Sequence, residues 1–190
     1  MVWADEKKWN LDGPDGNRSY WHDLRKEPLV FSTRNFGGGR VMCWAAFSGY
    51  GKAALCFISG KMNSLDYQKV VGDALDHYQR RLNGLPIVFQ QDNAPIHVSR
   101  STRRWFENRN VPLLDWPNRS PDLNPIENLW SILAKRVYAN YKQYNTVEEP
   151  KRAIRRAFLG LDQEVLENLV RSMSNRIYQV INRSGGLTDY

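Results

Sequence analysis

The order of apolar runs and turn residues constrains the fold of this chain more than any other feature. Three strand-like runs come first, and two of them, Val41–Ser48 and Ala53–Ser59, are joined by a glycine-containing turn at residues 49–52. The second half alternates helical segments with short continuous apolar runs, an order that favours parallel strands. We therefore predict an α/β fold with a mixed sheet, three antiparallel strands followed by parallel strands, flanked by helices and extended by C-terminal helices.

The individual elements are predicted from apolar spacing and from residues that begin and end helices. Strands are expected at Val2–Trp9, Val41–Ser48, Ala53–Ser59, Pro86–Gln91 and Val111–Leu114, and Arg18–Asp23 can return beside the first of them as a hairpin partner. Helices are expected from Asn63 or Ser64 to about Leu82, over His97–Asn108, from Pro125 along an apolar stripe to Tyr141, after a capping box at Thr146–Glu149, and from Asp162 to about Asn182. Residues 24–40 are predicted to form an irregular basic excursion.

Composition bounds the class of protein. A length of 190 residues suits one domain, 1–190, and 42% hydrophobic residues are enough for a core. The net charge of +7 and pI of about 9.5 favour a polyanionic partner. Cys43 and Cys56 lie in apolar runs and are expected to be buried thiols in a reducing compartment. No run approaches the length of a membrane span, so no membrane partner is expected.

One polar motif closes an apolar run, and a second polar motif opens a helical one. Residues 90–97 read Gln-Gln-Asp-Asn-Ala-Pro-Ile-His and place Asp92 at the end of a predicted strand. Residues 120–130 read Ser-Pro-Asp-Leu-Asn-Pro-Ile-Glu-Asn-Leu-Trp and place Glu127 in the first turn of a helix. Thirty-four residues separate these two acids, and a third acid, Asp5, lies in the first strand.

Each acid also has a purely structural interpretation. Asp92 can simply form a turn with Asn93. Glu127 can complete a capping box with Asn124, although its place at the edge of the apolar stripe lets it reach a strand end. Asp5 can be a solvated strand acid, whereas in a central strand it would be a costly half-buried charge. Glu6 points to the opposite face of that strand and is not expected to be a ligand of the same metal ion as Asp5.

Taken together, the three acids predict a metal centre. Carboxylates from three separate elements can hold two Mg²⁺ ions, which activate an attacking oxygen and stabilise a leaving oxygen in phosphoryl transfer. His97 is a candidate proton or phosphate contact, with a structural position at a helix start as the alternative. Arg34, Arg40 and Arg119 lie in predicted loops, where phosphate contacts are common, while the arginines of the helices are expected to be solvated. Trp116 is expected to be a core side chain or a platform for an unpaired base.

The motifs resemble the catalytic domain of the mariner superfamily of DNA transposases. The resemblance rests on the Asp-Glu-Lys-Lys start, on Leu-Asp-Gly-Pro-Asp-Gly at residues 11–16, and on the two motifs around Asp92 and Glu127. The spacing of 34 residues is similar to that of the nematode Tc branch. The resemblance implies a ribonuclease-H-like fold, with Asp5, Asp92 and Glu127 as catalytic, metal-binding triad and with Mg²⁺ or Mn²⁺ as cofactor.

The resemblance also implies a reaction and partners. Relatives nick double-stranded DNA at transposon ends, join the freed 3′-hydroxyl to a TA target, act as homodimers on DNA and work in the nucleus. Residues 11–40 fall where relatives carry a loop that clasps the partner subunit. Relatives also carry N-terminal helix-turn-helix modules, so we expect this chain to be part of something longer. Two alternatives stay open: a catalytically silent domesticated transposase that binds DNA or a protein partner, and a ribonuclease-H-like nuclease acting on RNA–DNA hybrids or junctions.

Overall fold

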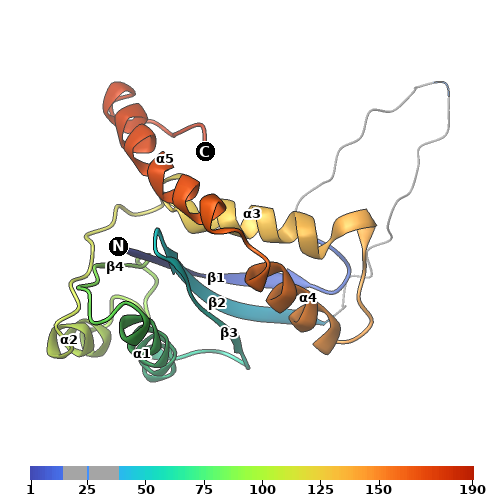
Figure 1. Cartoon of the computed structure of the whole chain (residues 1–190), viewed down its shortest axis with the longest axis horizontal. Coiled ribbons are helices and arrows are strands. Elements are labelled where there is room, and N and C mark those ends of the chain that lie inside the picture. Colours follow the sequence, from blue (N-terminus) through green and yellow to red (C-terminus); the bar gives the residue numbers. More distant parts are fainter. Residues whose placement is uncertain (15–24, 26–38) are drawn as a thin grey trace.

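The fold is built on one mixed sheet, seen edge-on between two layers of helices in the computed structural model (Figure 1). The structure describes residues 1–14, 25 and 39–190. Within them the sheet has the strand order β3-β2-β1-β4. The pairs β1–β2 and β2–β3 are antiparallel, and β1–β4 is parallel. The strands are β1 Val2–Asn10, β2 Arg40–Ser48, β3 Gly51–Ile58 and β4 Phe89–Gln90.

Helices cover both faces of this sheet. The helices are α1 Ser64–Arg81, α2 Arg100–Asn108, α3 Pro125–Val137, α4 Glu148–Leu159 and α5 Gln163–Asn182. Helices α1 and α2 lie on one face, and α3, α4 and α5 lie on the other (Figure 1). No helix among the described residues has the length and apolar character needed to cross a membrane. The mixed sheet predicted from the sequence is confirmed.

The alternation of side chains along β1 divides the core into two clusters. Trp3 and Trp9 belong to the cluster under α3–α5, whereas Val2 and Ala4 belong to the cluster under α1 and α2. Because successive strand residues point to opposite faces, Asp5 faces α3 and Glu6 faces the α1–α2 layer. This split decides which side chains each acid can meet.

Several predicted boundaries are confirmed, and the α1 start shows why. Asn63 caps α1, because its side chain accepts hydrogen bonds from the backbone N–H groups of Leu65 and Asp66 at 2.8 and 3.0 Å. The Asp66 carboxylate accepts in turn from the Asn63 N–H, which completes a capping box.

Both cysteines are free thiols, and Cys43 accepts a hydrogen bond from the indole of Trp9.

Two predicted strands are shorter than expected. The run 86–91 is paired only at Phe89–Gln90, and 111–114 contributes a single parallel bridge between Phe89 and Leu113. The adjoining Pro112 has no N–H to donate, so the ladder cannot extend through it. The predicted strand Arg18–Asp23 and nearly all of the loop 11–40 fall outside the described residues.

Helix starts and ends account for the remaining differences. The helix predicted from His97 begins at Arg100, because the hydroxyl of Ser99 caps it by accepting from the N–H of Thr102. The stripe predicted to run to Tyr141 leaves the helix after Val137, where Asn140 and Tyr141 adopt left-handed backbone conformations.

The two remaining caps predicted from the sequence are not formed. Helix α4 begins without the capping box predicted at Thr146–Glu149: Val147 occupies the cap position, and Glu149 accepts from the N–H of Asn145 instead. Asp162 precedes α5 as predicted, but its side chain makes no capping hydrogen bond. In both cases the local sequence pattern is present, and at α4 the contact of Glu149 with Asn145 replaces the predicted box.

One buried arginine of α5, Arg176, connects this helix to α3 and to the segment before it by hydrogen bonds. The guanidinium of Arg176 donates to the carbonyl oxygen of Asp122 at 2.6 Å and to the side-chain oxygen of Asn128 at 2.8 Å. The ring of Tyr190 lies against the same guanidinium, with 4.2 Å from its Cζ to the ring centroid. Asp122 also accepts from the N–H of Thr188, so the C-terminal residues pack onto the motif that contains Glu127.

Candidate active site

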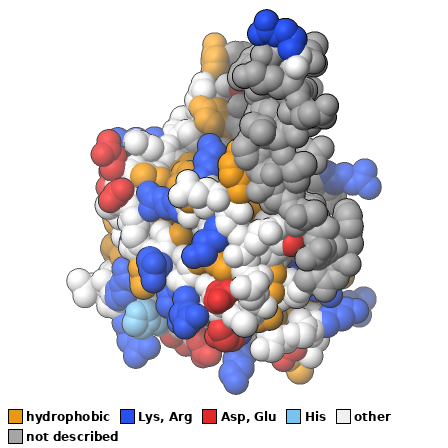
Figure 2. Space-filling view, turned by 90° about the vertical axis from the view of Figure 1, so that its right-hand side faces the viewer, with side chains coloured by type: hydrophobic (Ala, Val, Ile, Leu, Met, Phe, Trp, Pro, Cys, Tyr) orange, Lys and Arg blue, Asp and Glu red, His pale blue; other side chains and the backbone are white. Residues whose placement is uncertain are grey.

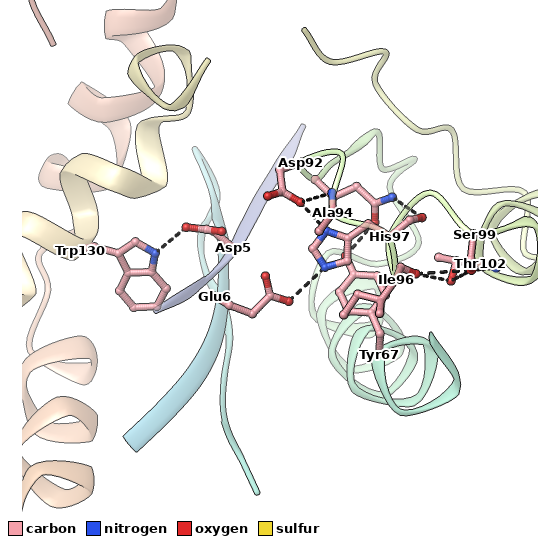
Figure 3. Close-up of polar contacts among 11 residues, drawn as sticks. Asp5, Glu6, Tyr67, Asp92, Ala94, Ile96, His97, Ser99, Thr102 and Trp130 are labelled. Carbon is pink, nitrogen blue, oxygen red and sulfur yellow. Dashed lines mark hydrogen bonds and ion pairs between the residues drawn. The ribbon is translucent and has the colours of Figure 1, made fainter. Parts of the chain in front are cut away.

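Asp5 is held in the middle of the sheet against α3. Its Oδ2 accepts a hydrogen bond of 3.1 Å from the indole N–H of Trp130 (Figure 3). Burial, followed by the nearby charges of Glu127 and Glu6, raises the pKa of Asp5 to about 7. The half-buried carboxylate expected from the sequence is therefore present, and a neighbouring cation would stabilise its charged form.

Asp92 lies just past the end of β4, in a segment without regular structure. Its Oδ1 accepts from the N–H of Ala94 at 2.9 Å and from the imidazole Nδ1 of His97 at 2.6 Å (Figure 3). The hydrogen bond from His97 is the main reason that the pKa of Asp92 is lowered. The side chain is 53% exposed, so this carboxylate is charged and open to a ligand.

Glu127 occupies the third position of α3, as the sequence predicts, but it does not complete a capping box. Asn124 caps the helix through its side-chain oxygen, which accepts from the N–H of Ile126 at 3.3 Å. A capping box would also require the Glu127 carboxylate to accept a hydrogen bond from the N–H of Asn124. That N–H donates instead to the carbonyl of Pro121 at 3.0 Å. The structural interpretation therefore does not account for the Glu127 carboxylate.

The three acids line one cavity of about 800 Å³, although they come from β1, the loop after β4 and helix α3. Trp116 and Arg119 border the same cavity. Asn93 donates to the carbonyl of Trp116 at 2.8 Å, and both residues also line a second cavity of about 710 Å³ beside α2. Trp116 packs edge-on against Trp3, with 5.7 Å between ring centroids, so it belongs partly to the core.

The donor set of this cavity fits a hard divalent cation. Within the described part of the chain, no three acidic, histidine or cysteine side chains are gathered closely enough to hold one ion together. Mg²⁺, however, usually takes only one or two protein carboxylates, and substrate oxygens and water complete its shell. Burial, together with the weaker repulsion from Glu127 and Glu6, raises the pKa of Asp5, so a cation in the cavity would stabilise its charged form.

His97 lies behind Asp92 and away from the cavity surface, with only 2% of the residue exposed. Its second ring nitrogen, Nε2, is 3.2 Å from a carboxylate oxygen of Glu6. Burial lowers the pKa of His97, but the hydrogen bonds to Asp92 and Glu6 outweigh it and raise the pKa to about 9. The sequence singled out His97 but gave no signal for its contact with Glu6, because the two residues are 91 positions apart.

The predicted phosphate contacts are dispersed. Arg119 is exposed at the rim of the cavity and has a left-handed backbone conformation with φ of 56°. Arg40 is exposed at the start of β2, paired with Asn10 at the end of the sheet away from β4. Arg34 falls outside the described residues. Figure 2 shows one face of the molecule, on which basic side chains are spread among apolar and acidic ones.

Sequence comparisons match this architecture to known proteins. Residues 1–149 match the model of the DDE superfamily endonucleases. The chain is 54% identical over 190 residues to the Tc3 transposase of Caenorhabditis elegans and covers 58% of it. It is 35% identical over 192 residues to the Tc1 transposase of C. elegans, with all of this chain and 70% of that protein covered.

Structural comparisons agree with this match. A Mos1 transposase paired-end complex with left transposon end superposes with a TM-score of 0.86 at 22% identity, and 98% of this chain and 55% of that chain are covered. The catalytic domain of Mos1 mariner transposase superposes with a TM-score of 0.75 at 19% identity, and covers 99% of this chain and 83% of that chain. The chain thus shares the ribonuclease-H-like fold of these structures and spans little more than half the length of the Tc3 protein.

Proposed function

Because this chain belongs to the DDE superfamily endonucleases, and within them to the Tc-type transposase catalytic domains, we propose that it cuts and rejoins DNA. Residues 1–190 form the catalytic domain, which cleaves transposon ends and transfers the 3′-hydroxyl into a TA target. One observation carries this proposal: Asp5, Asp92 and Glu127 come from three elements and line one cavity. Such convergence of carboxylates suits phosphoryl transfer.

The three carboxylates are proposed to hold two divalent cations, Mg²⁺ or Mn²⁺. When bound, the cations activate the attacking oxygen and stabilise the leaving oxygen of the phosphodiester. Structures of Mos1 transposase with Mg and with Mn support this choice of metal. Neighbouring groups orient two of the ligands: the indole of Trp130 donates to Asp5, and the N–H of Ala94 donates to Asp92.

The proposed substrate is double-stranded DNA. Arg119 borders the cavity and is proposed to contact a phosphate beside the scissile bond, while Arg40 would meet DNA farther from it. Arg34 is also proposed as a phosphate contact. The superposed paired-end complex of Mos1 transposase with a transposon end supports DNA as partner. A homodimer on DNA, a partner-clasping role for residues 11–40 and a nuclear location complete the proposal.

A cleavage assay tests this function directly. Labelled transposon-end DNA is incubated with Mn²⁺ or Mg²⁺ and with wild type, Glu127→Gln or Asp92→Asn. Of these three proteins, we expect only wild type to give metal-dependent nicks. The cleavage rate of Glu127→Gln and of Asp92→Asn should fall by more than the roughly 10–100-fold that is typical when a residue hydrogen-bonded to a metal ligand is removed. Glu164→Gln, an exposed acid on α5, is the matched control and should cut like wild type.

Other outcomes would contradict the proposal in distinguishable ways. DNA that is bound but left uncut by every protein would indicate a catalytically silent binding domain. Cutting of RNA–DNA hybrids in preference to duplex DNA would indicate a ribonuclease-H-like nuclease. Cleavage by Asp92→Asn at the wild-type rate in Mg²⁺ would remove that residue from the mechanism, because a neutral amide is a poor ligand for a hard cation.

A further inference from the structure

We propose that His97 is a positioning residue: it fixes the carboxylate of Asp92 and ties it to β1 through Glu6. This inference rests on the proposed function, because it concerns how one of the three proposed ligands is held. The three side chains form a continuous chain of contacts in which an imidazole lies between two carboxylates (Figure 3). No part of this chain of contacts needs a bound molecule.

The need for such a group follows from the place of Asp92. Residues 91–94 have no regular structure, so the sheet does not hold this side chain by strand pairing. The hydrogen bonds from Ala94 and His97 both end on Oδ1, at 2.9 and 2.6 Å. In the described part of the chain these contacts set the rotation of the carboxylate and leave Oδ2 for a cation.

The other side of the imidazole is anchored on the central strand. Glu6 follows Asp5 directly in β1, and its side chain points to the opposite face of the sheet. The contact of 3.2 Å between Glu6 and His97 therefore links the loop of Asp92 to the strand of Asp5. Two proposed ligands from distant parts of the sequence are thereby held at a fixed separation.

The imidazole is itself immobilised. Its ring lies over that of Tyr67, with 4.1 Å between centroids and 32° between planes. Gln91 donates to the carbonyl oxygen of His97 at 3.0 Å and accepts from the hydroxyl of Tyr67 at 2.7 Å. A side chain held on its ring face, its backbone and both nitrogens makes a rigid support for a ligand.

The same contacts exclude His97 as a proton-transfer group or phosphate ligand. Both ring nitrogens are occupied by carboxylates, and the side chain is only 3% exposed. A general base must lie within hydrogen-bond reach of the proton that it removes. His97 acts on the reaction only through Asp92, as groups behind metal ligands do.

Two substitutions at His97 distinguish the contribution of its Nδ1 contact from that of its Nε2 contact. His97→Asn places an amide near the position of Nδ1 and can keep the bond to Asp92, whereas His97→Gln reaches farther, toward Glu6. Glu6→Ala removes the contact with Nε2 of His97 and leaves the hydrophobic core intact, because Glu6 is only partly buried. His77→Gln, an exposed histidine on α1, is the control. Thermal unfolding of each variant reports whether it folds.

The readout is Mn²⁺ binding to the DNA-free protein by titration calorimetry, with Asp92→Asn defining the signal that belongs to the site. We expect His97→Gln to weaken this binding by about 10–100-fold, and His97→Asn and Glu6→Ala by less. In the cleavage assay, the Mn²⁺ concentration for half-maximal rate should rise by the same factor, and saturating Mn²⁺ should restore the rate.

The outcomes are decisive in each case. Unchanged Mn²⁺ affinity in a folded His97→Gln overturns the proposal, as does a wild type with no Asp92-dependent Mn²⁺ signal. A lower rate at saturating metal with an unchanged Mn²⁺ midpoint would assign His97 to proton transfer and also overturn it. Asp92-dependent Mn²⁺ binding without DNA cleavage would overturn the proposed function alone, since the effect of His97 is still measured on binding.

Discussion

At the scale of single residues, Asp5 shows how the site is prepared for positive charge. Burial and the neighbouring charges of Glu127 and Glu6 raise its pKa to about 7, whereas the bond from His97 lowers the pKa of Asp92. The two proposed ligands are therefore not equivalent near neutral pH. Asp92 is already ionised before a cation binds, whereas the protonated form of Asp5 must lose its proton when a cation binds.

The pH dependence of metal binding follows from this difference. An acid with a raised pKa is protonated below that pKa, so below about pH 7 a cation must displace the proton of Asp5. Apparent Mn²⁺ affinity should rise by up to about tenfold per pH unit up to pH 7 and then level off. Calorimetry in buffers of different ionisation enthalpy measures the released proton. Asp5→Asn should abolish the release, and a wild type that binds without releasing protons at pH 6 would contradict the assignment.

At the scale of elements, the motif around Glu127 is supported from behind by α5. Asp122 and Asn128 flank Glu127, and both bind the guanidinium of Arg176 through oxygen atoms. Arg176 is fully buried and its two acceptor residues are partly buried, so its removal would leave both oxygens without this donor. The polar residues of this motif that do not line the cavity of the three acids, Asp122 and Asn128, thus have a structural role.

Replacing this arginine should be costly. Arg176→Met is expected to lower the free energy of unfolding by about 2–4 kcal/mol, because two hydrogen bonds to a charged group are lost. Arg171→Met on the same helix breaks an exposed pair with Glu167 and should cost less than about 1 kcal/mol. Urea denaturation measures both values. Equal losses in the two variants would show that α5 is not fastened through Arg176.

The sequence predicted most elements because their signals are local. Asn63 and Asp66 form a cap from neighbouring residues, and the stripe from Ile126 to Val137 keeps helical spacing. The predictions failed where another contact competed, as when Ser99 capped α2 and Pro112 limited the edge strand. The sequence also predicted that the three acids belong to one site, and they line one cavity. The contact between Glu6 and His97 depends on packing between distant segments, which no local pattern encodes.

At the scale of the whole molecule, charge and architecture serve different purposes. The net charge of +7 provides a general attraction to polyanions, while the cavity carries at least three acids that repel them. Arg119 lies at the boundary between these two regions. DNA affinity should therefore depend steeply on salt, with basic side chains at the rim offsetting the local repulsion.

Salt titration measures this balance. The logarithm of the DNA association constant should fall linearly with the logarithm of salt concentration, by about 0.9 for each phosphate contact. Arg119→Ala should reduce this slope by about 1 and weaken binding to all duplexes alike. Lys69→Ala, an exposed residue on α1, should leave the slope unchanged. Binding that does not respond to salt would contradict the proposed phosphate contacts.

The parallel pairing of β1 with β4 also has a consequence during protein synthesis. Val2 pairs with Phe89, and the cavity needs residues as far apart in the chain as Asp5 and Glu127. A nascent chain on the ribosome therefore carries its acids apart until α3 has emerged from the exit tunnel. If the domain cuts DNA as proposed, prematurely terminated fragments that end before Glu127 would be inactive, and translation would confine the hazard of strand breakage to molecules synthesised past Glu127.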